Sequence, residues 1–443
     1  MKNNQVVFWS ITVALGGFLF GFDTAVISGA EQDIQRVWSL DSIQHGLTVS
    51  IALVGTVFGA LFGGFPSDRL GRKKTLFWIA VLYLVSAVGS ALAFDWYSFM
   101  IFRFLGGLGV GASSVAAPMY ISEISPANSR GRLVALFQFN VVFGILIAYL
   151  SNYLLDGIGP LAWRWMLGVE SFPALVFMIL VLYVPESPRW LIVKKNRIEE
   201  ARKTIEIING EQTEEIIQSI LASRHEKKEE SRLFASGQYK LPIMLAVLFA
   251  VFNQVSGINV IVYYAPRIFE MTGLGKSSAL FSTAGLGIIN FIFTLLAMRF
   301  IDQFGRRKLM LIGSYGLIVT LGLVAYSFYT ESFSGYAVPV YLFIYIGFFA
   351  FSQGAVIWVF ISEIFPNQVR ANGQSLGSFT HWILAAAITF IFPFITEKLG
   401  GGNTFMIFTI MMVLQLLFVW KMMPETKGKS LEQIEFLEQK MSA

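Results

Sequence analysis

Long apolar stretches, separated by short polar connections, recur along the whole 443-residue chain. A helix that crosses a bilayer needs about 20 mainly apolar residues. The stretches that meet this length lie near residues 6–30, 47–65, 75–94, 99–121, 132–155, 166–184, 241–266, 278–300, 308–329, 337–361, 372–396 and 404–423. They do not alternate apolar and polar residues, as the strands of a membrane β-barrel do. The pattern predicts an all-α membrane protein with twelve transmembrane helices.

One long polar stretch, residues 185–240, interrupts this pattern. It is rich in lysine, arginine and glutamate, and its segment 197–208 has the spacing of an amphipathic helix. We therefore expect a linker with short helices. The linker would separate an N-terminal six-helix bundle, residues 1–184, from residues 241–443, which hold a C-terminal six-helix bundle and a short cytoplasmic tail.

Short motifs of the first half return in the second half, at the same places among the predicted helices. The repeated segments are Asp68–Lys74 and Asp302–Lys308, Ile121–Ile124 and Ile361–Ile364, and Pro185–Ser187 and Pro424–Thr426. Two halves that repeat in the same orientation are typical of transporters that work by alternating access. Their substrate binds between the halves, near the middle of the membrane. The repeat therefore favours a transporter built from two parallel six-helix repeats.

The composition supports a membrane protein, because 55% of the residues are hydrophobic and only 14% are charged. A soluble domain has about 25% charged residues. The net charge of +5 does not indicate nucleic-acid binding, because the basic residues lie in short connections between apolar stretches. Most of them fall on the side that holds both termini, and positively charged loops stay inside the cell. We therefore expect a multi-pass protein of the inner (plasma) membrane with both termini in the cytoplasm.

The residues needed for an enzyme or a metal site are missing from the sequence. There is no cysteine, and the three histidines are far apart, so a zinc centre is not expected. We find neither a phosphate-binding loop of the Walker type nor a set of residues for nucleophilic catalysis. The sequence therefore predicts no enzyme activity, no cofactor and no metal.

Asp23 is an acidic residue inside the first apolar stretch. A charged side chain in the middle of a membrane helix costs about 3 kcal/mol or more, so such a residue suggests a function and a partner. Arg103, inside the fourth stretch, is the best candidate partner. Glu170 is a second acid within a predicted helix. The pair could bind and release a proton as the helices move, or it could be a static buried ion pair.

Seven segments together resemble the sugar porter family of the major facilitator superfamily. They are Gly21–Gly29, Asp68–Lys74, Pro118–Glu123, Pro185–Arg189, Gln254–Asn259, Asp302–Lys308 and Pro424–Gly428. The resemblance covers nearly the whole chain and is closest to bacterial proton–sugar symporters and facilitative hexose transporters. It implies that Asp23 and Arg103 form the proton-coupling pair, since a neutral residue replaces the aspartate in facilitators. It implies a part in coupling for Glu170 as well.

Polar and aromatic side chains inside the apolar stretches suggest a sugar site. Amides can both donate to and accept from hydroxyl groups, and aromatic faces can cover the apolar face of a sugar ring. The candidates, whose positions match the family's sugar ligands, are Phe20, Gln138, Asn253, Gln254, Asn259, Tyr263, Asn290, Trp358, His381 and Trp382. A straight helix would turn Gln254 and Asn259 about 140° apart. We therefore expect the helix to break at Gly257.

The chain departs from the family pattern at this site. The family has two glutamines where this chain has Asn253 and Gln254, and an amide where it has His381. Gly354-Ala355 replaces a glycine-proline pair, and Ala385 replaces an amide. The site therefore suits a monosaccharide, a hexose or a pentose, while its preference among sugars stays open.

The repeated motifs also suggest gating on the cytoplasmic side. Opposite charges there could hold the two halves together in one state and separate in the other. The candidates are Asp68, Arg69, Arg72, Glu123, Arg130, Asp302, Arg306, Glu363 and Arg370. Alternatively, these charges could serve only to set the topology.

The sequence as a whole predicts a monosaccharide transporter that works by alternating access and imports its substrate with protons. A uniporter, a sugar receptor and a drug–proton antiporter of the same fold are the alternatives. The short C-terminal tail disfavours the receptor, and the amides of the seventh helix disfavour the antiporter. The expected partners are a monosaccharide, protons and the lipid bilayer, with no nucleic acid. We expect a monomer, because the two-fold pairing is already internal.

Overall fold

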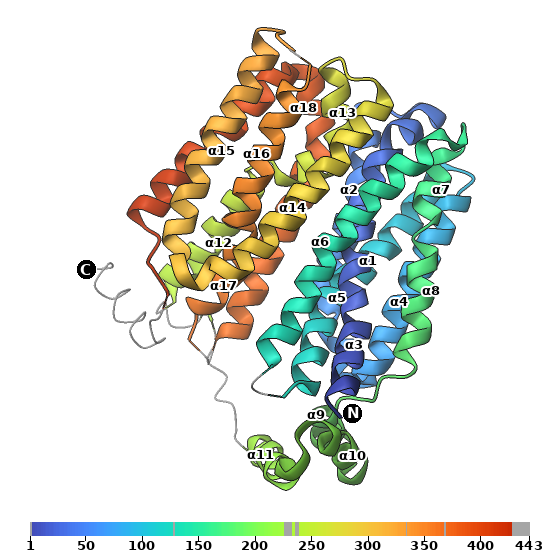
Figure 1. Ribbon diagram of the computed structural model, residues 1–443, viewed down its shortest axis with the longest axis vertical. Helices are drawn as coiled ribbons and strands as arrows, with labels where there is room; N and C mark the ends of the chain where they lie inside the picture. Colours follow the sequence, from blue (N-terminus) through green and yellow to red (C-terminus); the bar gives the residue numbers. More distant parts are fainter. Residues whose placement is uncertain are drawn as a thin grey trace. The chain divides into compact units, whose positions relative to one another are not determined.

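The computed structural model describes residues 2–126, 129–225, 233–234, 239–333, 335–366 and 369–427. The described residues form helices and connections without strands (Figure 1). The predicted all-α class is confirmed.

The helices of the first half are separated by short turns. They are α1 (Lys2–Val37), α2 (Ser42–Phe62), α3 (Gly64–Leu70), α4 (Arg72–Leu92), α5 (Trp96–Ile124), α6 (Arg130–Leu155), α7 (Ala162–Gly168) and α8 (Ser171–Val181). Helix α1 runs seven residues past the predicted end at residue 30, so that boundary was wrong. The extra turns carry Glu31, Asp33 and Gln35, and these polar side chains find partners in the folded chain.

The helices of the second half are more often interrupted. They are α12 (Lys240–Gln254), α13 (Ile258–Met271), α14 (Lys276–Phe304), α15 (Arg306–Tyr329), α16 (Ala337–Phe351), α17 (Gln353–Glu363) and α18 (Arg370–Lys421). Helix α18 has 52 residues and would be about 78 Å long if straight. That is more than twice the apolar thickness of a bilayer. Gly400, with φ of 78°, divides it into the predicted eleventh and twelfth helices.

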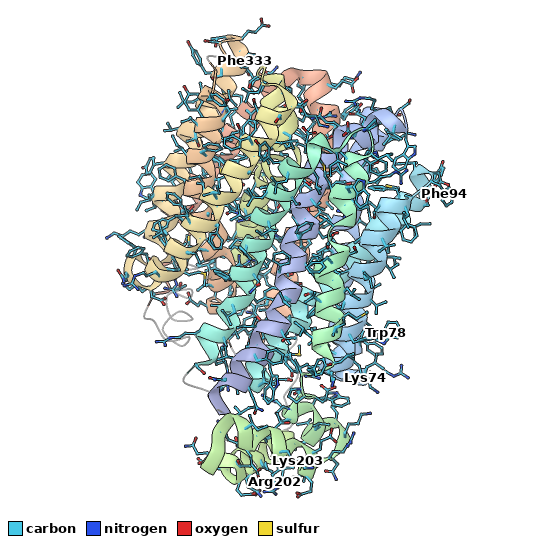
Figure 2. The ribbon with its side chains drawn as sticks, turned by 45° about the vertical axis from the view of Figure 1, so that its right-hand side comes forward. Lys74, Trp78, Phe94, Arg202, Lys203 and Phe333 are labelled. Atoms are coloured by element: carbon cyan, nitrogen blue, oxygen red, sulfur yellow. The ribbon has the colours of Figure 1, made fainter. Side chains whose placement is uncertain are left out.

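Eleven helical stretches of the described residues are long and apolar enough to cross a membrane, and α18 counts as one of them. The linker contains α9 (Pro188–Trp190), a π-turn (Leu191–Lys195), α10 (Ile198–Asn209) and α11 (Thr213–His225). Figure 2 shows Arg202 and Lys203 on its helices. Helix α10 confirms the amphipathic helix predicted at 197–208, and its buried Ala201 and Ile205 pack in a small core with Trp190 and Leu191.

The chain divides into two compact units by the contacts that its residues make. One unit contains Met1–Ala30 and Ile51–Lys228, and the other contains Glu31–Ser50 and Glu229–Ala443. The first has an apolar core that includes Tyr120 and Phe177. The core of the second includes Phe249 and Phe360. The end of α1 and the start of α2 thus pack with the second half of the sequence.

Glycines bring two helices of the first unit together. A Cβ atom on Gly107 of α5 would lie 1.9 Å from the carbonyl oxygen of Ala52 in α2. A Cβ atom on Gly55 would lie 2.3 Å from the carbonyl oxygen of Phe104. Only glycine allows backbones to approach this closely, as in other membrane helix pairs.

Candidate coupling and substrate sites

The ion pair between Asp23 and Arg103 lies in the interior of the first unit. Nη1 of Arg103 donates to Oδ1 of Asp23 at 2.6 Å, and Nη2 donates to the backbone oxygen of the same residue at 3.1 Å. Both residues are 1% exposed. The structure therefore joins the two residues that the sequence suggested as partners, through two nitrogens of one planar guanidinium.

Glu170, between α7 and α8, is buried beside this pair. Its carboxyl group lies close enough to that of Asp23 for the two to interact electrostatically. Its Oε1 has no hydrogen-bond partner among the described residues. Two acidic side chains therefore lie beside one arginine in the interior of the first unit.

Gly106 makes room for this arrangement. A Cβ atom there would lie 2.4 Å from the hydroxyl of Ser86 and 3.3 Å from Oδ1 of Asp23. Sequence reasoning did not identify this glycine, although it stands in the same helix as Arg103.

A break between α12 and α13 forms the polar centre of the second unit. Helix α12 ends at Gln254, α13 begins at Ile258, and Gly257 has φ of 84°. The predicted break is confirmed. Asn259 Nδ2 donates to Oε1 of Gln254 at 2.5 Å, and Gln254 Nε2 donates to Oδ1 of Asn253 at 3.0 Å. The break thus lets three amides from two helices meet.

His381 of α18 connects these amides to two tryptophans. Its Nδ1 lies 3.0 Å from Nε2 of Gln254, which donates to it. Its ring centroid lies 4.9 Å from that of Trp358 and 4.8 Å from that of Trp382. The histidine thus accepts a hydrogen bond as an amide oxygen would, and it also adds an aromatic face.

The other predicted sugar ligands are divided between the two units. Phe20 and Gln138 belong to the first unit, where the Phe20 ring lies 6.4 Å from that of Phe137. In the second unit, Tyr263 is buried in α13 and Asn290 is half-buried in α14. Within the described chain, Asn290 makes no hydrogen bond to the amides around Gln254.

Gln353 is a polar residue of the second unit that sequence reasoning missed. It is fully buried, and its backbone oxygen lies 3.5 Å from Nδ2 of Asn253. Its side chain donates to Oε1 of Gln415 at 2.7 Å, and Gln415 donates to Ser314 at 2.9 Å. Amides in two otherwise apolar helices were the signal for this second polar layer.

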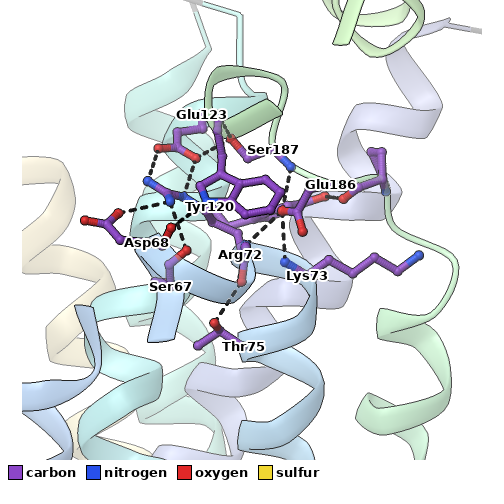
Figure 3. A network of polar contacts seen from close by, with 12 residues as sticks. Ser67, Asp68, Arg72, Lys73, Thr75, Tyr120, Glu123, Glu186 and Ser187 are labelled. Atoms are coloured by element: carbon purple, nitrogen blue, oxygen red, sulfur yellow. Dashed lines mark hydrogen bonds and ion pairs between the residues drawn. The ribbon is translucent and has the colours of Figure 1, made fainter. Parts of the chain in front are cut away.

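Arg72, at the start of α4, is the centre of the first repeated motif (Figure 3). It donates twice to Glu123, at 3.0 Å each, and once to Asp68 at 3.1 Å. Glu186 accepts from the backbone nitrogens of Arg72 at 2.8 Å and Lys73 at 3.1 Å. Burial raises the pKa of Glu186, while these backbone hydrogen bonds lower it.

The second half repeats this network residue by residue. Arg306 donates to Glu363 at 2.8 and 3.1 Å and to Asp302 at 2.9 Å. Glu425 accepts from the backbone nitrogen of Arg306 at 2.9 Å. Each network joins elements within one unit, the Arg72 network in the first and the Arg306 network in the second. Sequence reasoning noted the motifs that contain Glu186 and Glu425 but not their role as acceptors.

The remaining charged candidates stand outside these networks. The Arg69 guanidinium lies 6.0 Å from the ring centroid of Phe65. Arg130 is exposed at the start of α6, and Arg370 donates to the backbone oxygen of Phe365 at 3.3 Å.

A buried cluster at the end of α1 was not predicted. Oε2 of Glu31 lies 2.7 Å from Nε2 of His45, and Oε1 accepts from Nε of Arg267 at 3.2 Å. Nearby, Lys276 donates to Asp33 at 3.0 Å. The signal was available, because Glu31 follows directly on an apolar stretch and His45 precedes the next one.

Comparison with known proteins identifies the family. The profile described as "Sugar (and other) transporter" matches residues 9–437. The chain is 39% identical to the arabinose-proton symporter of Bacillus subtilis (98% of this chain, 95% of the relative) and 36% identical to the D-xylose-proton symporter of Escherichia coli (98% and 96%). It is also similar to the inward open structure of the xylose transporter XylE from E. coli, with a TM-score of 0.86 and 35% identity over 97% of this chain and 98% of that one. The chain belongs to the sugar transporter family, with the major facilitator fold.

Proposed function

We propose that the protein imports a monosaccharide together with a proton, and that Asp23, Arg103 and Glu170 carry the proton. The observation that carries this proposal is the buried contact of Arg103 with Asp23, beside which the acid Glu170 is also buried. Two acids beside one arginine hold a proton that can leave when helices α1 and α5 change their spacing. The proton-symporter names of the relatives support this assignment.

The amide cluster around Gln254 is the proposed sugar site. Its donors and acceptors bond to one another, and a sugar's hydroxyl groups could replace these bonds. Trp358 is 39% exposed and offers a ring face to the sugar. Tyr263, Asn290 and Trp382 are further proposed sugar ligands of the same unit, and Phe20 and Gln138 stay proposed sugar ligands of the first unit. The relatives are named for arabinose, xylose and glucose, so a pentose or a hexose is the proposed substrate.

The two networks around Arg72 and Arg306 are proposed to act in gating. Each would hold the helix ends of its own half together in one state, and its ion pairs would separate in the other. We place both termini in the cytoplasm and the protein, as a monomer, in the inner membrane. The division into two six-helix bundles and a linker belongs to the same proposal.

Uptake of radiolabelled arabinose, xylose and glucose into proteoliposomes, with and without an inward proton gradient, tests the coupling. We expect accumulation above equilibrium only with the gradient. Asp23→Asn should abolish accumulation but retain exchange of sugar across the membrane. Asp41→Asn, which alters an exposed aspartate, serves as the matched control.

Two outcomes would overturn parts of the proposal. If sugars equilibrate without accumulating in both the wild type and Asp23→Asn, the protein is a uniporter and the buried pair is structural. If no monosaccharide moves at all, the proposed sugar site is wrong.

A further inference from the structure

A cavity of about 620 Å³ lies on the first unit, away from the coupling and sugar sites. It is formed where α3 ends, α4 begins and α8 ends, and the linker residues up to Glu200 close it. Its basic lining residues are Arg69, Lys73, Lys74, Lys195 and Arg197. Arg69 and Glu186, named above with the proposed gating network, line it, but none of the functions proposed above places a ligand in this cavity.

The positive charge of this cavity is largely uncompensated. Arg69, Lys73, Lys74 and Lys195 form no ion pair within the described part of the chain. Arg197 is paired with Glu200. The other acid of the lining is Glu186, whose carboxylate is already occupied by backbone N–H groups. Several ammonium groups therefore face one space that holds no free anion.

Two lysines are held in place beside this space. Lys73 Nζ donates to the backbone oxygen of Leu182 at 2.7 Å, which leaves two of its three N–H donors available. Lys195 Nζ lies 5.2 Å from the ring centroid of Trp190. Trp190 is itself fixed by a hydrogen bond to the backbone oxygen of Asp68 at 2.8 Å. These contacts reduce the entropy that the lysines would lose on binding an anion.

The side of the cavity away from the linker is apolar and exposed. Trp78 of α4 is 58% exposed, and Leu182 at the end of α8 is 54% exposed. Figure 2 shows Trp78 and Lys74 close together on the outer face of this unit, with Lys74 nearer to the linker. On a membrane-spanning helix such an exposed surface contacts lipid, and tryptophan prefers the level of the headgroups. The cavity thus joins an acyl-chain surface to a cluster of cations.

We propose that this cavity binds an anionic phospholipid. The headgroup phosphate lies among Lys73, Lys74 and Lys195, and an acyl chain follows Trp78 and Leu182. Basic pockets between membrane helices recognise such headgroups. A zwitterionic lipid fits less well, because its ammonium or choline group needs an acid, and both acids of the lining are already bonded.

The second half of the chain contains a natural comparison. Arg307 and Lys308 occupy the motif positions of Lys73 and Lys74, but the Arg307 guanidinium already donates to the backbone oxygens of Val419 at 3.3 Å and Trp420 at 2.5 Å. Gln303 stands in the place of Arg69, and Ile312 in that of Trp78. The second motif thus has an exposed lysine, Lys308, but no counterpart of Arg69 or of the interfacial tryptophan.

Equilibrium binding of fluorescent phosphatidylglycerol to the purified full-length protein in neutral detergent tests the proposal. We expect saturable binding that phosphatidylcholine does not displace and that salt weakens. The Lys73→Gln/Lys74→Gln/Lys195→Gln variant should bind about 100-fold more weakly. Lys308→Gln is the matched control and should bind like the wild type. Lys74→Arg should retain binding, whereas Trp78→Ser should weaken it.

Competition distinguishes a lipid from a soluble phosphate. We expect glycerol 3-phosphate to displace the fluorescent lipid only at far higher concentration than unlabelled phosphatidylglycerol. Equal displacement would show a site for soluble phosphates, and equal binding of phosphatidylcholine would show a nonspecific surface. If the triple variant unfolds, Lys74→Gln alone alters one exposed side chain and should weaken binding about five-fold. Unchanged binding in that variant would overturn the proposal.

Discussion

The imidazole Nε2 of His45 lies 2.7 Å from Oε2 of Glu31, and neither side chain is exposed. The other carboxylate oxygen of Glu31 accepts from Arg267 of α13. His45 also packs 6.0 Å from the ring of Tyr264, whose hydroxyl donates to the backbone oxygen of Thr389 in α18 at 3.0 Å. Residues of α1, α2, α13 and α18 therefore meet around one buried carboxylate.

Arg267→Ala should lower the stability of the protein by about 3 kcal/mol, because it leaves Glu31 buried without its cation. Thermal unfolding of the purified protein in detergent measures this loss. Arg36→Ala is the control, since Arg36 is 76% exposed and its contact with Asp33 should contribute under about 1 kcal/mol. Combining Arg267→Ala with Glu31→Gln should recover part of the loss. A double variant that loses the sum of both effects would contradict the pairing.

Arg103→Lys should keep the charge beside Asp23 but lose the two-pronged contact. One ammonium cannot reach Oδ1 and the backbone oxygen of Asp23 with the geometry of the guanidinium. We expect proton-driven sugar accumulation to fall about ten-fold, whereas exchange of sugar changes little. The uptake assay with and without the gradient separates these quantities. Equal accumulation in both proteins would mean that the arginine supplies only charge.

His381→Ala should weaken sugar binding, because Gln254 loses its acceptor and the two tryptophans lose the ring between them. We expect a rise in the dissociation constant of about ten-fold, which corresponds to about 1.4 kcal/mol. His381→Gln should bind more tightly than His381→Ala, since the amide oxygen restores the acceptor. Isothermal titration with the best-transported sugar measures both, with Ser375→Ala on the same helix as the control. Equal affinity of the alanine variant and the wild type would remove His381 from the site.

Glu186 should make stability depend on pH in a defined direction. Burial is the largest influence on this carboxyl group and raises its pKa above the ordinary 4.5. The folded chain therefore binds more protons than the unfolded chain just above pH 4.5, so stability should fall as pH rises through this window. Glu186→Gln should lose this contribution, so its melting temperature should fall less than that of the wild type between pH 4.5 and 7.

Glu199→Gln is the control for this pH series, because Glu199 is exposed on the linker and 84% of its side chain faces solvent. Its melting curves should follow those of the wild type at every pH. If Glu186→Gln also follows the wild type across the series, the carboxyl group of Glu186 does not titrate differently on folding.

The sequence by itself determined the membrane helices, the break at Gly257 and the identity of the Asp23–Arg103 pair. The free energy of transferring a helix into the bilayer is a sum over the residues of that helix alone. A run of about 20 apolar residues is therefore sufficient to predict a crossing. The break followed from helical geometry between Gln254 and Asn259, which is also local. Two opposite charges in otherwise apolar helices left few choices of partner.

Only the tertiary structure decided which distant groups satisfy the remaining polar residues. Helix α1 continues to Val37 because His45 and Arg267 surround Glu31, and nothing in residues 31–37 alone predicts this. The same holds for Glu186, whose carboxylate accepts hydrogen bonds from backbone N–H groups more than a hundred positions earlier in the chain. Hydrogen bonds and ion pairs depend on distances of about 3 Å between groups far apart in sequence. Those distances exist only once the helices have packed.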